Sequence, residues 1–285
     1  MKVLLTGANG QLGRALQACA PAGHEIAATG STQLDIGDEV RVRAVVAVEK
    51  PALIINAAAY TAVDRAESEE AEALRINGAG VGYLAAAAGE TGARLVHVST
   101  DFVFDGQGGI PYRSDSLTAP LGAYGRTKLA GEQVAGAEAL IVRTAWVYGS
   151  HGHNFVRTML RLMAGRDEVR VVADQIGTPT FAVSLAGAIW ALAAAGAKGI
   201  YHYTDSGAAS WYDFAVAIQE EALALGLLDR QVPVIPIATA DFPTPAARPS
   251  YSVLDKSETF ALLGAPAPHW RVNLRTMLRE IKENG

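Results

Sequence analysis

A tyrosine and a lysine four positions apart, Tyr124 and Lys128, are residues whose types and spacing suggest chemistry. On a helix, this spacing places both side chains on one face. A nearby ammonium stabilises a phenolate, so we expect the pKa of Tyr124 to fall toward working pH. Such a phenol is suited to donate a proton to a carbonyl group undergoing reduction. Because the same spacing also arises by chance on exposed helices, the surrounding motifs decide its meaning.

Two upstream strands end in residues that suit a ligand site. Residues 95–101 read as a strand that finishes in polar side chains, among them Thr100 and Asp101. An earlier strand, residues 53–56, is followed by three small residues: Ala57, Ala58 and Ala59. Open α/β sheets bind ligands at the carboxyl ends of their strands. We therefore expect the hydroxyl of Thr100 to join the tyrosine, and the alanines to let a dinucleotide lie close.

A glycine-rich loop directly follows the first predicted strand, residues 3–6, and opens the first predicted helix. Glycines allow a tight turn and let a pyrophosphate approach the helix N-terminus, where free N–H groups favour anions. In this context the loop predicts cofactor binding rather than an ordinary turn. The residues assigned to the cofactor are Gly7, Asn9, Gly10, Gln11, Leu12, Gly13 and Arg14.

The end of the second predicted strand bears on the choice of cofactor. Sites specific for NAD usually carry a carboxylate there, bonded to the ribose 2′-hydroxyl. Residues 28–32 read Ala-Thr-Gly-Ser-Thr and contain no carboxylate. This favours NADPH, with NADH also accepted, and Arg14 is either a partner of the 2′-phosphate or a solvated side chain. Asp35 remains open between a helix N-cap and, together with Ile36, a contact to adenine of the kind implied by the family resemblance given below.

Short apolar runs alternate with alanine-rich amphipathic segments through the first half of the chain. This pattern predicts a doubly wound parallel sheet of the Rossmann type in an α/β fold. After about residue 150, strands become fewer and prolines more frequent, which indicates a smaller α/β substrate domain. We assign residues 1–150 to a dinucleotide-binding domain and residues 151–285 to the substrate domain. A helix near residues 180–195 could pack back on the first domain.

Prolines make residues 241–249 extended or looped, and helices are expected to resume near Lys256 and again near Leu274. Composition limits the other function classes. The net charge of −5 with no basic run argues against nucleic-acid binding. A single cysteine excludes an intrachain disulfide. With no targeting or membrane-spanning segment recognisable, we expect a cytoplasmic protein.

These motifs, taken in order, resemble the extended short-chain dehydrogenase/reductases and, within them, the dTDP-4-dehydrorhamnose reductase family. Thr100 precedes Tyr124 at the spacing typical of that superfamily. The Ser-Thr-Asp segment at residues 99–101 and the Asp-Gln-x-Gly-x-Pro-Thr segment at residues 174–180 are fairly specific to this branch. The resemblance spans nearly the whole chain.

The resemblance implies reduction of the C4 keto group of a dTDP-4-keto-6-deoxysugar by NADPH or NADH. Tyr124 would donate the proton, Lys128 would hold the nicotinamide ribose, and Thr100 would bond the keto oxygen. The residues implied for the deoxysugar are Thr61, Val63, Trp146 and, beside the catalytic hydroxyl, Asp101. Those implied for the nucleotide diphosphate are Asn154, Gln175 and Arg248. A monomer or a homodimer would fit.

Two other functions stay open at this point. A reductase, epimerase or dehydratase could act on another nucleotide sugar, although dehydration is disfavoured without an Asp-Glu pair beside Thr100. A non-catalytic protein resembling the regulatory β subunit of methionine adenosyltransferase would not need hydroxyl, tyrosine and lysine together. No metal is expected, because the helix after the glycine loop has no acid in its first turn and His151-Gly152-His153 reads as a solvated loop.

Overall fold

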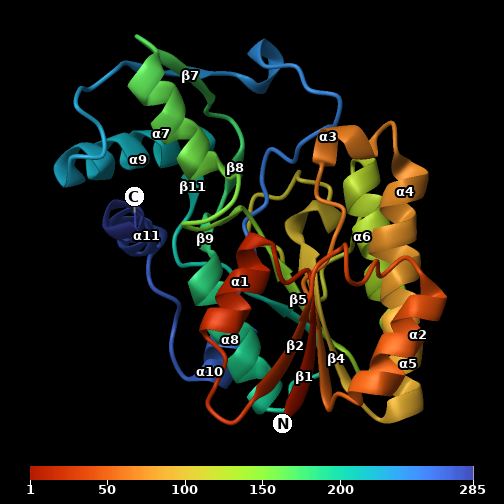
Figure 1. The fold of residues 1–285 in the computed structure, drawn as a ribbon. Coiled ribbons are helices and arrows are strands. Elements are labelled where there is room, and N and C mark those ends of the chain that lie inside the picture. Colours follow the sequence, from red (N-terminus) through yellow and green to blue (C-terminus); the bar gives the residue numbers. More distant parts are fainter. Residues whose placement is uncertain (285) are drawn as a thin grey trace.

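A six-stranded sheet, parallel throughout, forms the centre of the molecule in this computed structural model, which describes residues 1–284 (Figure 1). The strand order is β10-β5-β4-β3-β1-β2. The six strands are β1 (Lys2–Thr6), β2 (Glu25–Thr29), β3 (Leu53–Asn56), β4 (Arg94–Thr100), β5 (Leu140–Thr144) and β10 (Gly199–His202). This order reverses beside β1, which is where doubly wound sheets bind nucleotides.

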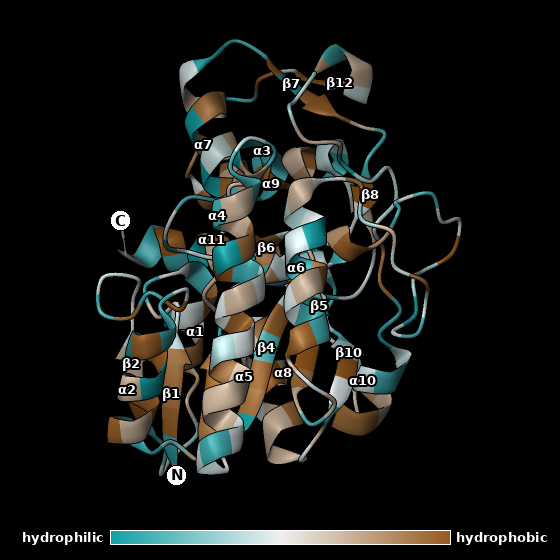
Figure 2. Cartoon of the chain, turned by 90° about the vertical axis from the view of Figure 1, so that its right-hand side faces the viewer, coloured by the Kyte–Doolittle hydropathy of each residue, from teal (hydrophilic) through white to brown (hydrophobic). Residues whose placement is uncertain are grey.

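Alternate residues of each strand serve two separate cores. Leu5 and Ile55 face one core, whereas Leu4 and Ile54 face the other, and all four side chains are fully buried. Because successive side chains of a strand point to opposite faces of the sheet, an unbroken apolar run such as that in β3 contributes to the cores on both faces. Burying one such side chain contributes about 1.5–3 kcal/mol. In Figure 2 the central strands such as β1 and β4 are accordingly mostly brown, the colour of hydrophobic residues.

Two layers of helices cover the sheet (Figure 1). One layer contains α1 (Gln11–Ala18), α8 (Ala182–Ala194) and α10 (Ser257–Leu263). The other contains α2 (Glu39–Glu49), α5 (Gly80–Thr91) and α6 (Ala123–Val134), joined by α3 (Val63–Ala66), α4 (Glu70–Leu74) and a π-helical turn at Arg75–Ala79. The doubly wound Rossmann-type fold expected from the sequence is confirmed.

A second lobe is built around α9 (Trp211–Leu225), packed between α7 (Phe155–Gly165) and α11 (Trp270–Asn284). Short strand pairs complete it: β6 (Val147–Tyr148) with β9 (Thr180–Phe181), β7 (Val169–Val172) with β12 (Val234–Ile237), and β8 (Ile176–Gly177) with β11 (Ala209–Ser210). The apolar core of the second lobe is separate from the two sheet-side cores. Two 3-10 turns are also present: Asp101–Val103, directly after β4, and Thr239–Asp241, after β12.

The chain returns from the second lobe to the sheet. The helix expected near residues 180–195 is α8, and its buried side chains pack with those of α1. β10 then pairs with β5 as an edge strand that the sequence pattern did not identify. The helices expected near Lys256 and Leu274 are confirmed as α10 and α11. A domain boundary near residue 150 remains a proposal. Within residues 1–284, no helix is long and apolar enough to span a membrane.

Candidate functional site

The glycine loop passes from β1 to α1 at the carboxyl edge of the sheet. Gly7 has a φ of +69°, and a Cβ there would lie 2.5 Å from the backbone of Ala57. A Cβ on Gly13 would lie 2.2 Å from the carbonyl oxygen of Gly7. Both positions therefore require glycine, since the loop is folded tightly against the segment after β3.

The N-terminus of α1 has the features of an anion site. Gly10 precedes the helix in extended conformation, and within the described chain no side chain caps it. Unpaired N–H groups and the helix dipole together favour a phosphate at this position. The glycine cradle and this helix end fit the pyrophosphate of a dinucleotide, with Asn9 exposed beside it and Leu12 packed into the core below.

Helix α6 carries Tyr124 in its first turn and Lys128 one turn later. Its N-cap is Gly122, which has no side chain to accept a backbone hydrogen bond. Glu67 fulfils this role from the α3–α4 connection, because its carboxylate accepts a 2.8 Å hydrogen bond from the N–H of Ala123. The negative charge also suits the positive end of the helix dipole. This contact fixes the turn that holds Tyr124.

Burial raises the pKa of Tyr124 to about 12, although the hydroxyl of Thr100 opposes this shift. Our expectation that Lys128 lowers the tyrosine pKa is therefore not met in this structure. The physical reason is that the ammonium position of Lys128 is directed into the sheet, toward His97 and the carbonyl of Val98. Tyr124 is accordingly held as a neutral phenol, which is the form that donates a proton.

Lys128 is almost completely buried, at 1% exposure. Its Nζ donates to the carbonyl oxygen of Val98 at 2.7 Å and lies 3.2 Å from Nε2 of His97. Burial lowers the lysine pKa to about 8, and the charge of Glu132 opposes that shift. Burial and the neighbouring lysine also lower the pKa of His97 well below its usual value.

Thr100 and Asp101 stand at the end of β4, beside Tyr124. The hydroxyl of Thr100 donates to Oδ1 of Asp101 at 3.0 Å and accepts from the N–H of Phe102 at 3.2 Å. Burial raises the pKa of Asp101 to about 6, against the opposing effects of Ser252 and Thr100. Oδ2 of Asp101 is buried without a hydrogen-bond partner among the described residues. An unpaired buried acceptor beside the tyrosine suits a hydroxyl group of a ligand.

Trp146 adopts a strained backbone conformation, with a φ of +48°. Its ring stacks on Trp211 with centroids 3.5 Å apart, and a Cβ on Gly177 would lie 2.6 Å from the indole. Non-glycine residues in this region cost about 1–3 kcal/mol and cluster at functional sites. Stacking on Trp211 holds the indole of Trp146 in place, and the role of Trp146 toward a sugar stays a prediction.

The residues chosen for the diphosphate are each engaged within the protein. Arg248 forms a two-point ion pair with Asp64, at 3.0 and 2.8 Å. Gln175 donates to the hydroxyl of Thr239, and Asn154 caps α7. Asn154 also donates to Gln11 of the glycine loop at 2.9 Å, which ties the second lobe to the cofactor cradle. Their role toward a diphosphate stays a prediction.

Asp35 does not cap a helix, because Asp38 caps α2 instead. The Asp35 carboxylate accepts from the N–H of Gly37 and pairs with Arg75 at 2.9 Å. Ile36 is buried in the core beneath α5. Thr61 is exposed on the segment after β3, and Val63 begins α3 as a half-buried residue. These positions are compatible with cofactor and sugar contacts, which remain predictions.

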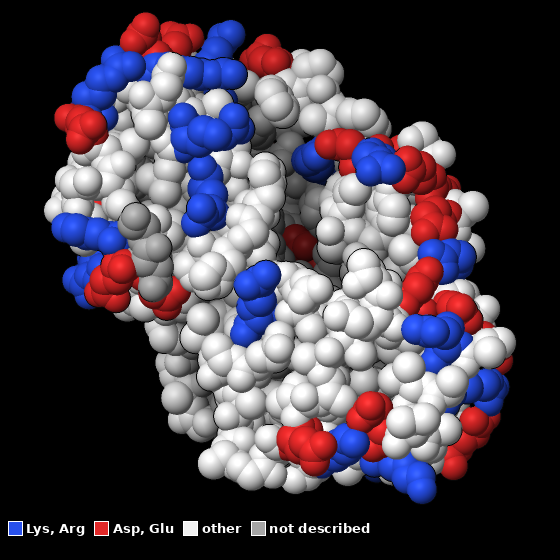
Figure 3. All heavy atoms as spheres, viewed as in Figure 1, with Lys and Arg blue, Asp and Glu red and all other residues white. Residues whose placement is uncertain are grey.

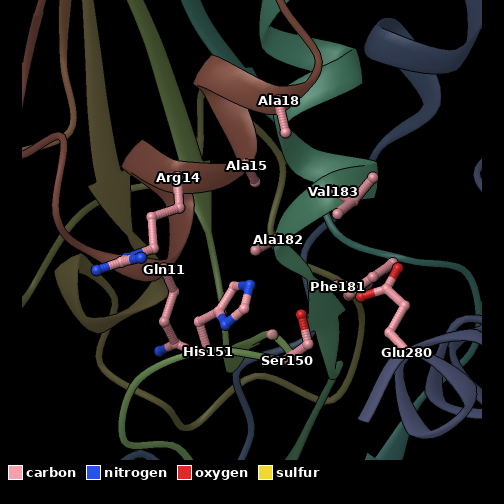
Figure 4. Close-up of a pocket in the computed structure, with 11 residues that line it drawn as sticks. Gln11, Arg14, Ala15, Ala18, Ser150, His151, Phe181, Ala182, Val183 and Glu280 are labelled. Atoms are coloured by element: carbon pink, nitrogen blue, oxygen red, sulfur yellow. The ribbon is translucent and has the colours of Figure 1, made fainter. Parts of the chain in front are cut away.

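Arg14 is exposed, and its Nε donates to the carbonyl oxygen of Asn9 at 3.1 Å. A cavity of about 260 Å³ lies beside it, between α1, α8, α11 and the loop at residues 149–151 (Figure 4). None of Thr100, Tyr124 or Lys128 lines this cavity. Figure 3 shows a separate hollow between the lobe that bears α7 and the lobe that bears α3. Within residues 1–284, no cluster of His, Cys, Asp and Glu could hold a metal ion.

Several residues that shape the site were not identified from the sequence. Glu132 and Arg143 form a pair with both side chains 3% exposed, and Ser99 also donates to Glu132. This pair attaches α6 to β4 and β5. His97 was also not identified. A histidine within the otherwise apolar strand at residues 95–98 could have indicated that this position is special.

The fold and the site together define an extended short-chain dehydrogenase/reductase. A glycine cradle at the sheet reversal lies beside a hydroxyl, tyrosine and lysine on adjacent elements, which is the arrangement of that class. Comparison with known proteins makes the assignment more specific. The family model described as the RmlD substrate binding domain matches residues 1–283.

Relatives match over nearly their full length. A dTDP-4-dehydrorhamnose reductase from Burkholderia thailandensis is 42% identical over 295 aligned positions, which cover 99% of each chain. A solved structure of such a reductase from Clostridium acetobutylicum has a TM-score of 0.93 and 41% identity, covering 99% of this chain and 100% of that one. Another, from Bacillus anthracis in complex with NADP, has a TM-score of 0.92 and 39% identity, covering 98% and 99%. The chain belongs to the dTDP-4-dehydrorhamnose reductase family.

Proposed function

We propose that this protein uses NADPH to reduce the C4 keto group of dTDP-4-dehydro-6-deoxy-L-mannose, giving dTDP-L-rhamnose. The observation that carries the proposal is the placement of Thr100, Tyr124 and Lys128 beside the glycine cradle at one edge of the sheet. The similarity of this chain to reductases of that name supports the substrate. The complex of the Bacillus anthracis relative with NADP supports the cofactor.

The residues present fit a dinucleotide. The glycine cradle and the open N-terminus of α1 would hold its pyrophosphate, and Ala57, Ala58 and Ala59 leave room along its length. The absence of a carboxylate at residues 28–32 leaves space for a 2′-phosphate. Arg14 bonds the carbonyl oxygen of Asn9, whose side chain lies against Gly30. NADPH, when bound, supplies the hydride that adds to C4 of the sugar.

Tyr124 is the proton donor in this proposal. Its neutral phenol gives a proton to the keto oxygen, so that the carbonyl becomes a hydroxyl once carbon has received the hydride. Thr100 orients the same oxygen by a hydrogen bond. Lys128 is placed one helical turn from Tyr124 to bind a ribose hydroxyl. Trp146, Thr61 and Val63 would border the deoxysugar.

Binding of the diphosphate would change the contacts of Arg248. Its guanidinium already bonds both oxygens of Asp64, so a diphosphate must share it or displace that carboxylate. Gln175 and Asn154 complete the proposed contacts. We further propose a cytoplasmic enzyme that acts as a monomer or a homodimer.

The test is to follow nicotinamide absorbance with NADPH and, separately, NADH, while the keto-sugar is generated in the reaction. Oxidation that depends on the complete mixture supports the reductase, and the two rates decide the cofactor. Tyr124→Phe should retain cofactor affinity and lose most turnover, whereas Tyr83→Phe on α5 serves as the control. Unchanged turnover in Tyr124→Phe would refute the mechanism. Cofactor binding without oxidation would favour another keto-sugar or a non-catalytic role.

A further inference from the structure

A row of polar side chains crosses the buried sheet and ends at Lys128. Thr6, Asn56 and His97 are register partners on β1, β3 and β4, and all three are at most 1% exposed. The Asn56 side-chain nitrogen lies 3.1 Å from Nδ1 of His97, whose Nε2 lies 3.2 Å from Nζ of Lys128. Each group therefore has a hydrogen-bonding neighbour, and the direction of each bond decides which atoms carry protons.

The first link of the row has a fixed direction. The backbone N–H of Ala58 donates to Oδ1 of Asn56 at 3.1 Å, and a backbone N–H can only donate. Thr6 also donates to this oxygen, at 2.6 Å. Reversing the amide of Asn56 would bring its NH₂ group against the N–H of Ala58 in a buried place, which is costly. The NH₂ group of Asn56 must therefore face His97.

This orientation selects one form of His97. Because Asn56 donates to Nδ1, that nitrogen must be unprotonated, which excludes both the imidazolium and the Nδ1–H tautomer. The remaining form is neutral and carries its proton on Nε2. Complete burial of the ring also favours the uncharged state. The Nε2–H bond consequently points at Lys128.

An ammonium has three donors and no acceptor, so it cannot receive this bond. A free amine can receive it, because its nitrogen keeps a lone pair. We propose that His97 is a positioning residue that donates its Nε2–H to Lys128 and holds the lysine as a free amine in the enzyme without cofactor. One N–H of that amine donates to Val98, and the other is left for a ribose hydroxyl.

The surroundings of Lys128 agree with this assignment. Glu132, on the next turn of α6, is the charged group whose field acts on the lysine, and its carboxylate is already neutralised by Arg143. The nearby titratable group on the same helix is Tyr124, held as a neutral phenol. A bond that only the free amine can accept lowers the lysine pKa further than burial alone. Without a charged lysine, Tyr124 keeps its proton until the cofactor and substrate bind.

Nitrogen-15 NMR of labelled histidines tests the proposal directly. His97 should remain an Nε2–H tautomer between about pH 6 and pH 9, a range that spans the usual histidine pKa and a lowered lysine pKa. His202 is a matched internal control, because its Nδ1 faces the carbonyl of Tyr112 and must carry the proton. The two buried rings should thus show opposite tautomers. An Nδ1–H or charged His97 would overturn the proposal.

His97→Gln supplies a second measurement and assigns the resonance. The glutamine oxygen can accept from an ammonium, so the pKa of Lys128 seen in kcat/KM should shift to higher pH by about one unit or more. An unchanged profile counts against the proposal. If this variant does not fold, His202→Gln still separates the two buried rings in the spectrum. Assigning the pKa in the kcat/KM profile to Lys128 rests on the proposed function, whereas the tautomer of His97 does not. The proposed function and the tautomer can therefore fail independently.

Discussion

The carboxylate of Glu67 caps the catalytic helix from outside it, and its removal should affect Tyr124 specifically. In Glu67→Ala, the N–H of Ala123 loses its 2.8 Å partner at the turn that holds the tyrosine. Loss of an N-cap costs about 0.5–2 kcal/mol. If that free energy is lost from the arrangement needed for proton donation, kcat falls by about 2- to 30-fold.

A second glutamate close to Glu67 in the sequence provides a matched control. Glu70 also contacts α6, but it pairs with Arg126 where both side chains are more than 40% exposed. Such surface pairs contribute about 0–1 kcal/mol. Glu70→Ala should therefore leave kcat nearly unchanged, whereas Glu67→Gln should recover much of the lost activity, because its amide oxygen still accepts.

Three measurements distinguish these outcomes. Urea unfolding followed by tryptophan fluorescence gives the free energy of unfolding, steady-state kinetics gives kcat, and amide exchange at Ala123 reports the first turn itself. Glu67→Ala should show faster exchange at Ala123 than Glu70→Ala. Equal stability, kcat and exchange in the two alanine variants would show that the capping argument is wrong.

Three further predictions follow from the structure, each tested by a variant of the chain. Glu132→Gln should lower the free energy of unfolding by about 3–5 kcal/mol in denaturant titrations, whereas replacing Glu132 and Arg143 together by leucine and methionine should cost much less, because no buried charge is left alone. Gly13→Ala should abolish NADPH binding, measured by calorimetry, because its Cβ would lie 2.2 Å from the carbonyl oxygen of Gly7. The control Gly89→Ala should bind NADPH normally, because a Cβ there meets nothing within 4 Å, and its free energy of unfolding should rise by about 0.5–1 kcal/mol. The pKa of Asp64 is lowered chiefly by the hydrogen bond from Arg248. The contribution of Asp64 to the free energy of unfolding is therefore present above about pH 4 and is lost as pH falls through the lowered pKa. Asp64→Asn should lose less stability than the unmodified protein in denaturant titrations on acidification, and equal losses would contradict this.

Local sequence was sufficient to place Tyr124 beside Lys128 and to predict the glycine turn; their roles in catalysis and cofactor binding stay proposals. Tyr124 and Lys128 lie on one helix, and the glycines lie in one turn, so their relative placement depends only on helix and turn geometry. The four glutamates within residues 67–72 are typical of the start of a helix, and α4 does begin at Glu70. Glu67, however, caps a different helix that is remote in sequence.

The sequence by itself determined the parallel sheet and the placement of Tyr124 and Lys128 one turn apart on one helix, because apolar periodicity and local spacing specify them directly. The tertiary structure decided what surrounds that pair. The register of β3 and β4 places Asn56 beside His97, and packing of α6 brings Lys128 onto the same ring. Neither register nor packing can be derived from local spacing, since both depend on how separate elements fill one core. Packing of Tyr124 against the small cluster of Ala66, Ala73 and Ala123 also depends on separate elements, and the resulting desolvation keeps Tyr124 a neutral phenol.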